Sequence, residues 1–146
     1  DVQAALAARA LALRAEHDLR EDLGLRDAGA PASVAAGALL GEHQFFGFAV
    51  RGTASAEDDH RCEIRLARWR EVLGGLAFDV EANRFLHHMV RFLVGTMIDV
   101  ATHQRPREDF SALLVAAVND EVSPPAPACG LCLEQVTYPA ALYPTA

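Results

Sequence analysis

The chain has 146 residues, of which 51% are hydrophobic and 23% are charged, and it carries a formal net charge of −7. This length is sufficient for one domain with a substantial core, and the composition is typical of a folded globular protein rather than a disordered chain. The negative charge argues against a general nucleic-acid binder, because contacts with phosphates need a positive surface.

The charge is unevenly distributed along the chain. Residues 61–107 contain eight arginines and five carboxylates, a balance of +3, whereas residues 1–60 and residues 108–146 each carry −5. We therefore expect any RNA-facing surface in the middle of the chain. No apolar run reaches about 18 residues, and the N-terminal residues lack a signal-peptide core, so the sequence predicts a cytoplasmic protein without membrane contact.

The N-terminal part of the chain favours two helices. Alanine and leucine alternate with arginine and glutamate at helical spacing from Val2 to about Leu23, which predicts one long helix. Glycine and proline then break the chain, and Ser33 is a suitable N-cap for a second helix, Val34 to Leu40. These features predict a helical lead-in at residues 1–32 and a separate domain at residues 33–146.

The next part predicts an aromatic loop followed by a β-hairpin. Three phenylalanines between Glu42 and Val50 indicate an irregular segment that packs its rings. Polar and apolar residues alternate in Arg61–Arg70 and again in Leu76–Glu81, as in half-buried strands. Gly74 and Gly75 supply a turn between them, so the simplest arrangement is an antiparallel hairpin.

The segment Asn83–His103 is predicted to form one amphipathic helix with Asn83 as its N-cap. A broad apolar side contains Phe85, Leu86, Met89, Val90, Phe92, Leu93, Met97 and Val100. A narrow side contains Arg84, His88, Arg91, Gly95 and Thr102, with His87 and Asp99 at its edges. This narrow side is either a solvated polar face or a functional site.

Two residues of the narrow side favour a site. A glycine within a helix costs about 1 kcal/mol relative to alanine, so Gly95 indicates that another segment packs closely there. Arg91 stands among so many apolar residues that its charge must face either water or an anion.

The last part of the chain predicts a helix, an extended linker and a strand. Arg105-Pro106 can open a helix with acidic residues in its first turn, and three prolines between residues 124 and 127 end it. Leu131–Tyr138 is rich in β-forming residues and returns to the sheet. Strands and helices do not alternate as βαβ units, so the predicted class is α+β, with helices packed on one face of an antiparallel sheet.

The string R-F-L-H-H-M-V-R-F-L-V-G-T-M, from Arg84 to Met97, resembles the central helix of the tRNA pseudouridine synthase A family. Three further strings resemble that family in the right order: L-L-G-E-H-Q-F-F-G-F at Leu39–Phe48, A-P-A-C-G-L-C-L at Ala126–Leu133 and V-T-Y-P at Val136–Pro139. The family's R-T-D-x-G-V-H-A motif, which carries the catalytic aspartate, is absent. The resemblance therefore implies the C-terminal half of such a synthase, with a pseudouridine-synthase-like fold.

The resemblance also implies an activity and its requirements. The family isomerises uridine to pseudouridine in the anticodon stem-loop of tRNA, without a metal or an organic cofactor. Arg91 matches the family arginine that pairs with the catalytic aspartate, and Leu131 matches a position near the uridine pocket. The implied partners are tRNA, the N-terminal half of the same enzyme and a second copy in a homodimer.

Other candidate contacts with the substrate are weaker. His88 and Arg84 lie near Arg91 in the predicted helix, and Arg65 and Arg68 stand on the predicted strand with two further arginines, Arg61 and Arg70. Four arginines on one strand are more often a solvated face than a phosphate site, and Leu131 is equally well explained as a core residue. His87 and His88 point in different directions on a helix, so joint metal binding is not expected.

Two departures from the family pattern stand beside these candidates. Gln44 replaces an aspartate in the family's H-D-F string, and Val118, Asn119 and Asp120 replace a K-D-R string. The second change removes two basic groups.

Two other classes of protein remain open. Cys129 and Cys132 form a C-x-x-C pair, with Cys62 and His60 as further ligands, but a lone pair without a second C-x-x-C is a weak zinc signature. The second alternative is an inactive RNA-binding or dimerisation module, because the catalytic aspartate motif is missing from this chain.

Overall fold

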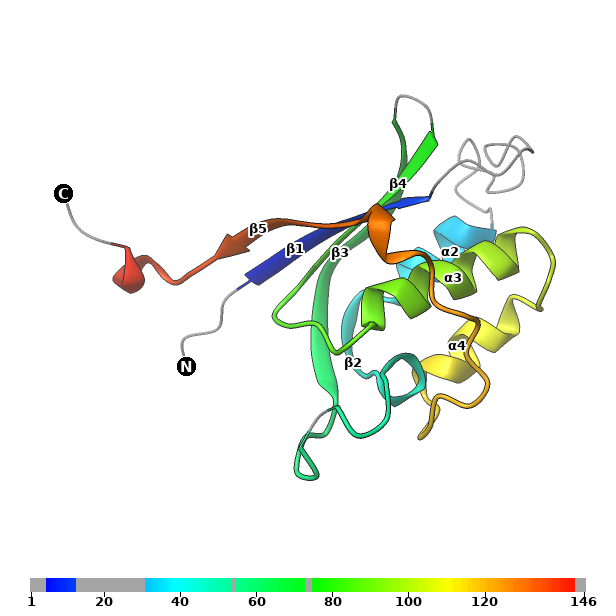
Figure 1. Ribbon diagram of the computed structural model, residues 1–146, viewed down its shortest axis with the longest axis horizontal. Coiled ribbons are helices and arrows are strands. Elements are labelled where there is room, and N and C mark those ends of the chain that lie inside the picture. The colour runs from blue at the N-terminus through cyan, green and yellow to red at the C-terminus, as the bar shows by residue number, and fades with distance from the viewer. Residues whose placement is uncertain (1–4, 13–30, 54, 73–74, 144–146) are drawn as a thin grey trace.

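The computed structural model describes residues 5–12, 31–53, 55–72 and 75–143. These residues form a five-stranded sheet in the order β2-β3-β4-β1-β5, and each neighbouring pair is antiparallel. Three helices lie together on one face of the sheet (Figure 1). The strands are β1 (Ala5–Ala12), β2 (Gly41–Gln44), β3 (Arg61–Val72), β4 (Gly75–Ala82) and β5 (Leu131–Thr137), and the helices are α2 (Pro31–Ala38), α3 (Met89–Ala101) and α4 (Glu108–Leu114). The predicted α+β class is confirmed.

The hairpin of β3 and β4 forms as predicted, with Trp69 opposite Phe78 and Arg68 opposite Asp79. A register shift between Ile64 and Leu66 changes which residues of β3 face the helices. The buried residues of β3 are therefore Cys62 and Ile64 before the shift and Trp69 after it. Residues 73–74, which include the predicted turn residue Gly74, lie outside the described residues.

The predicted helix Val2–Leu23 is wrong at Ala5–Ala12, which form strand β1. This strand pairs with β4 on one side and with β5 on the other, so its backbone hydrogen bonds come from distant segments. Helix propensity is a weak preference that tertiary pairing overrides, and here the alanine pattern contained no sign of those partners. Residues 13–23 of the predicted helix lie outside the described residues, and the boundary at residue 32 stays a prediction.

Helix α3 is the centre of the core, but it begins five residues later than predicted, at Met89, with His88 in place of Asn83 at the N-cap position. Its buried side includes Met89, Leu93, Met97 and Val100, in agreement with the predicted apolar face. Residues 83–88 instead form a turn between β4 and α3. Asn83 does not cap a helix, because its side-chain oxygen accepts a hydrogen bond from the Glu63 N–H (2.8 Å).

The remaining predictions for the described residues hold with small shifts. Helix α2 starts at Pro31, so Ser33 lies inside its first turn rather than at its N-cap. Helix α4 has Glu108 and Asp109 in its first turn, as expected. In the aromatic loop, Phe45 and Phe48 are fully buried. Within the described segments, no helix has the length and apolar character needed to cross a bilayer.

Candidate functional site

The candidate site is built around Arg91, in the first turn of α3. Its side-chain Nε donates a hydrogen bond to the carbonyl oxygen of Ala126 (2.7 Å), and the Ala126 N–H donates to the carbonyl of Arg91 (3.0 Å). The side chain and the backbone of Arg91 are thus both hydrogen-bonded to Ala126, which lies 35 positions later in the chain. The hydrogen bond from Nε holds the guanidinium group against the loop and so restricts its direction.

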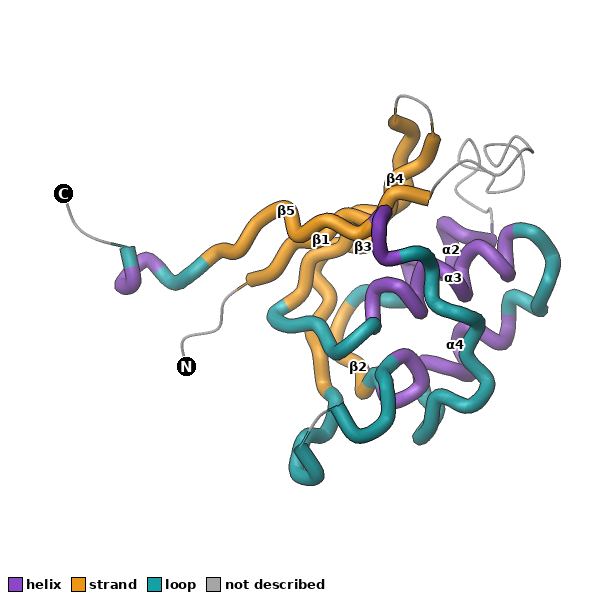
Figure 2. Tube along the Cα trace, viewed as in Figure 1, coloured by secondary structure: helices purple, strands orange, loops and turns teal. Residues whose placement is uncertain are grey.

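The prediction that a segment packs against Gly95 is confirmed. A Cβ atom at Gly95 would lie 2.2 Å from the carbonyl oxygen of Pro124 and 3.3 Å from the Ala126 nitrogen. The loop from α4 to β5 therefore crosses α3 in direct backbone contact, as Figure 2 shows in teal over purple. Only glycine leaves room for that crossing.

Polar contacts hold the rest of this loop. Arg105 donates to the Ser123 hydroxyl and to the Glu121 carbonyl, both at 2.9 Å. Asn119 donates from its amide to the Ala49 carbonyl (2.6 Å), and Asp120 accepts two hydrogen bonds from Arg51 (2.7 and 2.8 Å). The Val118–Asp120 departure from the family pattern thus provides contacts that fix the loop.

The terminal nitrogens of Arg91 have no partner among the described residues, and no described carboxylate forms an ion pair with it. The first turn of α3 also contains no acidic residue. A helix N-terminus carries a partial positive charge, so a cation there adds to the field rather than cancelling it. The local electrostatics therefore favour an anion supplied from outside the described residues.

His88 precedes this arginine by three residues and interacts with it electrostatically. It precedes α3 with a left-handed backbone (φ 60°), and its ring stacks on the His87 ring at a centroid distance of 4.1 Å. Burial lowers the pKa of His88, and the neighbouring His87 and Arg91 lower it further. The neutral imidazole is thus favoured next to Arg91, and the structure brings these two predicted site residues together.

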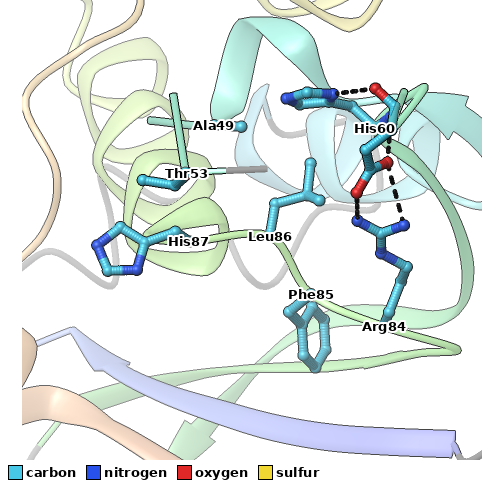
Figure 3. A pocket seen from close by; sticks show the side chains of 8 residues that line it. Ala49, Thr53, His60, Arg84, Phe85, Leu86 and His87 are labelled. Atoms are coloured by element: carbon cyan, nitrogen blue, oxygen red, sulfur yellow. Dashed lines mark hydrogen bonds and ion pairs between the residues drawn. The ribbon is translucent and has the colours of Figure 1, made fainter. Parts of the chain in front are cut away.

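Arg84 is not on the helix, so it does not share a helical face with Arg91 as predicted. It lines a pocket of about 150 Å³ together with Thr53, His60 and His87, and Figure 3 shows its guanidinium pointing at a carboxylate. That carboxylate belongs to Asp58, and the Nη2–Oδ2 distance is 2.5 Å. The sequence did not indicate Asp58, since a polar loop residue carries no sign of a partner 26 positions away.

Leu131 begins β5 and is 37% exposed, so it lies outside the core of the described residues. It pairs with Ala10 of β1. It also lies only five residues after Ala126, the residue to which Arg91 is hydrogen-bonded. Leu133, on the same strand, is 60% exposed. Strand β5 therefore presents apolar side chains to solvent at an edge of the sheet.

The arginines of β3 are all engaged with carboxylates. Arg65 pairs with Glu63 (3.3 Å), and Arg68 and Arg70 both pair with Asp79 (3.6 and 2.5 Å). Arg61 pairs with Glu42 and Asp59. These ion pairs reduce the free positive charge of the strand. Among the described residues, neither Arg65 nor Arg68 forms a hydrogen bond or an ion pair with a residue that contacts Arg91.

The cysteines do not form a metal-binding cluster in the part of the chain that the structure describes. Cys62 is buried in β3, whereas Cys129 and Cys132 are exposed. Burial raises the pKa of the Cys62 thiol to about 11, which disfavours the thiolate that a metal would need.

An antiparallel sheet with helices on one face defines an α+β protein, in which Arg91 is anchored at Ala126 and pairs with no carboxylate among the described residues. The sequence model of the tRNA pseudouridine synthase family matches residues 35–139, and the chain belongs to this family. The resemblance of its four motifs is thereby confirmed.

Individual relatives support the same assignment. The chain is 36% identical over 104 residues to tRNA pseudouridine synthase A of Moorella thermoacetica, an alignment that covers 71% of this chain and 42% of that protein. It is 39% identical over 104 residues to tRNA pseudouridine synthase A of Chlorobium luteolum, covering 69% and 39%. For the Frankia casuarinae protein the identity is 39% over 110 residues, covering 75% and 39%. The chain thus spans about two fifths of the length of these curated relatives.

Proposed function

We propose that this chain supplies the arginine side of a composite active site that isomerises uridine to pseudouridine in the anticodon stem-loop of tRNA. In that reaction the bond from the ribose C1′ to N1 of the base breaks, and a bond from C1′ to C5 forms. The C5 proton is released and N1 gains a proton. The base must leave its stack to react, so the enzyme needs a pocket as well as a carboxylate.

The observation that carries the proposal is the geometry of Arg91. Its Nε is bound to Ala126, which leaves both terminal nitrogens for a carboxylate in a bidentate contact. Arginine suits this role because it stays charged and its planar group fixes the orientation of its partner. The partner is the catalytic aspartate of an upstream segment, whose ionised form Arg91 stabilises.

Other residues have secondary roles in the proposal. Leu131 provides an apolar wall for the uracil ring, and neutral His88 packs beside the arginine. Arg84 acts through its neighbours rather than on RNA, because Asp58 occupies its guanidinium. Arg65 and Arg68 contact tRNA phosphates only by exchanging a carboxylate for a phosphate oxygen. The chemistry uses no cofactor.

Strand β5 supports the assignment of the upstream half as a partner. Six of its seven residues, all but Val136, are exposed, and its outer edge has no strand beside it in the described sheet. An edge with exposed apolar side chains favours the addition of further structure. We propose that the N-terminal half of the enzyme docks on the β5 edge. We also propose that the whole enzyme is a homodimer located in the cytoplasm.

The test is pseudouridine formation in an unmodified tRNA transcript, with the chain alone and then with the upstream segment that carries R-T-D. Activity only in the mixture is expected. Arg91→Lys should lower turnover by about tenfold or more, because it retains the charge but loses the bidentate contact. Arg107→Lys, at an exposed arginine that precedes α4, is the matched control and should retain activity.

Two results contradict the proposal. Activity of the chain alone would mean that one of its own carboxylates performs the chemistry. Near-normal turnover by Arg91→Lys in the active mixture would remove the role of Arg91.

The second candidate is an RNA-binding or dimerisation module without activity. The observation that favours it for the isolated chain is the missing aspartate motif. An inactive mixture that nevertheless binds the tRNA would support this candidate over the synthase.

A further inference from the structure

The turn between β4 and α3, residues 83–88, has no repeating backbone hydrogen bonds of its own and is held by other elements. At its start, the Asn83 N–H donates to the Glu63 carbonyl (3.2 Å), and the Asn83 side-chain oxygen accepts from the Glu63 N–H (2.8 Å). Near its end, the Val50 N–H donates to the His87 carbonyl (3.4 Å). Backbone contacts therefore fix both ends of the turn.

A side-chain ion pair fixes the middle of the turn. Arg84 donates from both terminal nitrogens to Asp58, with N–O distances of 3.2 and 2.5 Å. The Asp58 side chain is only 18% exposed, and its Oδ1 also accepts from the His60 N–H (2.8 Å). The Arg84 contact and then the His60 N–H hold the pKa of Asp58 below its ordinary value. Asp58 is therefore a fixed anchor rather than a mobile surface carboxylate.

The turn ends in a strained residue. His88 has a positive φ of 60°, which is uncommon for any residue with a Cβ. Such a backbone persists only where surrounding contacts determine it. His88 is also the last residue before α3, and Arg91 follows it by three positions, so the backbone of His88 sets where the first turn of the helix begins.

We propose that the ion pair of Asp58 and Arg84 is a positioning device, which holds the strained turn and thereby fixes the direction of the Arg91 guanidinium. Neither residue touches the reacting atoms. The effect on turnover rests on the proposed function, whereas the effect on the geometry of Arg91 does not. Asp59, the next residue, is a built-in comparison: it also pairs with an arginine (3.0 Å), but that arginine, Arg61, lies on β3 and not on the turn.

The geometry is tested on this chain without any activity. The Nε–H of Arg91 is bound to Ala126, so its exchange with solvent can be followed by NMR. Asp58→Asn should accelerate that exchange by about tenfold, and Asp59→Asn should leave it within about twofold of the wild type. Equal exchange rates in the two variants would overturn the proposal. If Asp58→Asn does not fold, Arg84→Lys, which keeps the charge and loses one of the two hydrogen bonds, must show the same acceleration.

Turnover tests the same device in the active mixture of the chain and its upstream segment. Asp58→Asn should lower kcat by about fivefold with KM unchanged, because tRNA binding does not depend on Arg91 alone. In an Arg91→Lys background the further loss should shrink to less than about twofold, since both changes disturb one contact. A full fivefold loss in both backgrounds would show that Asp58 acts independently of Arg91. If the wild-type mixture forms no pseudouridine, the proposed function fails, and the NMR comparison alone decides this inference.

Discussion

Gly95 is the residue of α3 over which the loop from α4 to β5 crosses. Replacing it with alanine puts a methyl group 2.2 Å from the Pro124 carbonyl oxygen, which is backbone and cannot rotate away. We expect Gly95→Ala to lower the free energy of unfolding by about 2 kcal/mol, as overpacking in a core does. Urea denaturation measures this change.

The matched control is Gly37→Ala, in helix α2. A Cβ atom there has no neighbour within 4 Å, and the residue is exposed. The substitution should therefore stabilise the protein by up to about 1 kcal/mol through helix propensity alone. If both variants changed stability equally, the close crossing of the loop over α3 would be contradicted.

At the scale of residues, the sequence predicted the needs of Arg91 and Gly95 but not their partners. A helical glycine implies a closely packed neighbour, because a close contact explains its cost, and an arginine among apolar residues implies contact with water or an anion. The neighbour of both is the loop at Pro124–Ala126, about 30 residues later. A single sequence does not encode such a long-range contact in any local pattern.

At the scale of elements, periodicity predicted the hairpin of β3 and β4 because polar and apolar residues alternate in both sequences, although β4 is buried on both of its faces. It overextended α3, because the apolar residues Phe85 and Leu86 continue the helical pattern although the chain turns there. It failed for β1, where alanine favours a helix while the pairing with β4 and β5 requires a strand. The errors thus lie where tertiary contacts decide the backbone.

The reactivity of the Cys62 thiol, on strand β3, reports whether the helices cover the inner face of the sheet. Cys62 is fully buried on its inner face with a pKa raised to about 11 by burial, whereas Cys129 and Cys132 are exposed. Near pH 8, where about a quarter of ordinary thiols ionise, iodoacetamide should label the two exposed cysteines and spare Cys62. Mass spectrometry of digested protein gives the sites.

Labelling in urea is the control for this measurement. All three cysteines should react once the chain unfolds, since burial alone protects Cys62. Rapid labelling of Cys62 in native buffer would contradict the described packing of β3 against the helices.

At the scale of the whole molecule, the sheet has helices on one face and an apolar edge strand at one end (Figure 1). A long, exposed and apolar edge is prone to pair with another chain. The isolated chain should therefore self-associate with rising concentration, and Leu133→Lys should reduce this, because Leu133 is 60% exposed on β5. Sedimentation velocity at several concentrations measures the effect.

Val115→Lys is the matched control, because Val115 is 84% exposed but lies at the end of α4, away from β5. It should leave self-association unchanged. The assignment of β5 as the associating edge would be refuted if Val115→Lys reduced self-association as much as Leu133→Lys does.

The crossing of the loop over α3 also fixes both ends of the segment from Ala126 to Leu131. One end is pinned to Arg91 and the other enters the sheet opposite Ala10. Because neighbouring strand residues point to opposite faces, inserting one residue here would turn Leu131 to the other side of the sheet while Arg91 stayed in place. In the proposed site, the length of this short segment would therefore set the position of Leu131 relative to Arg91.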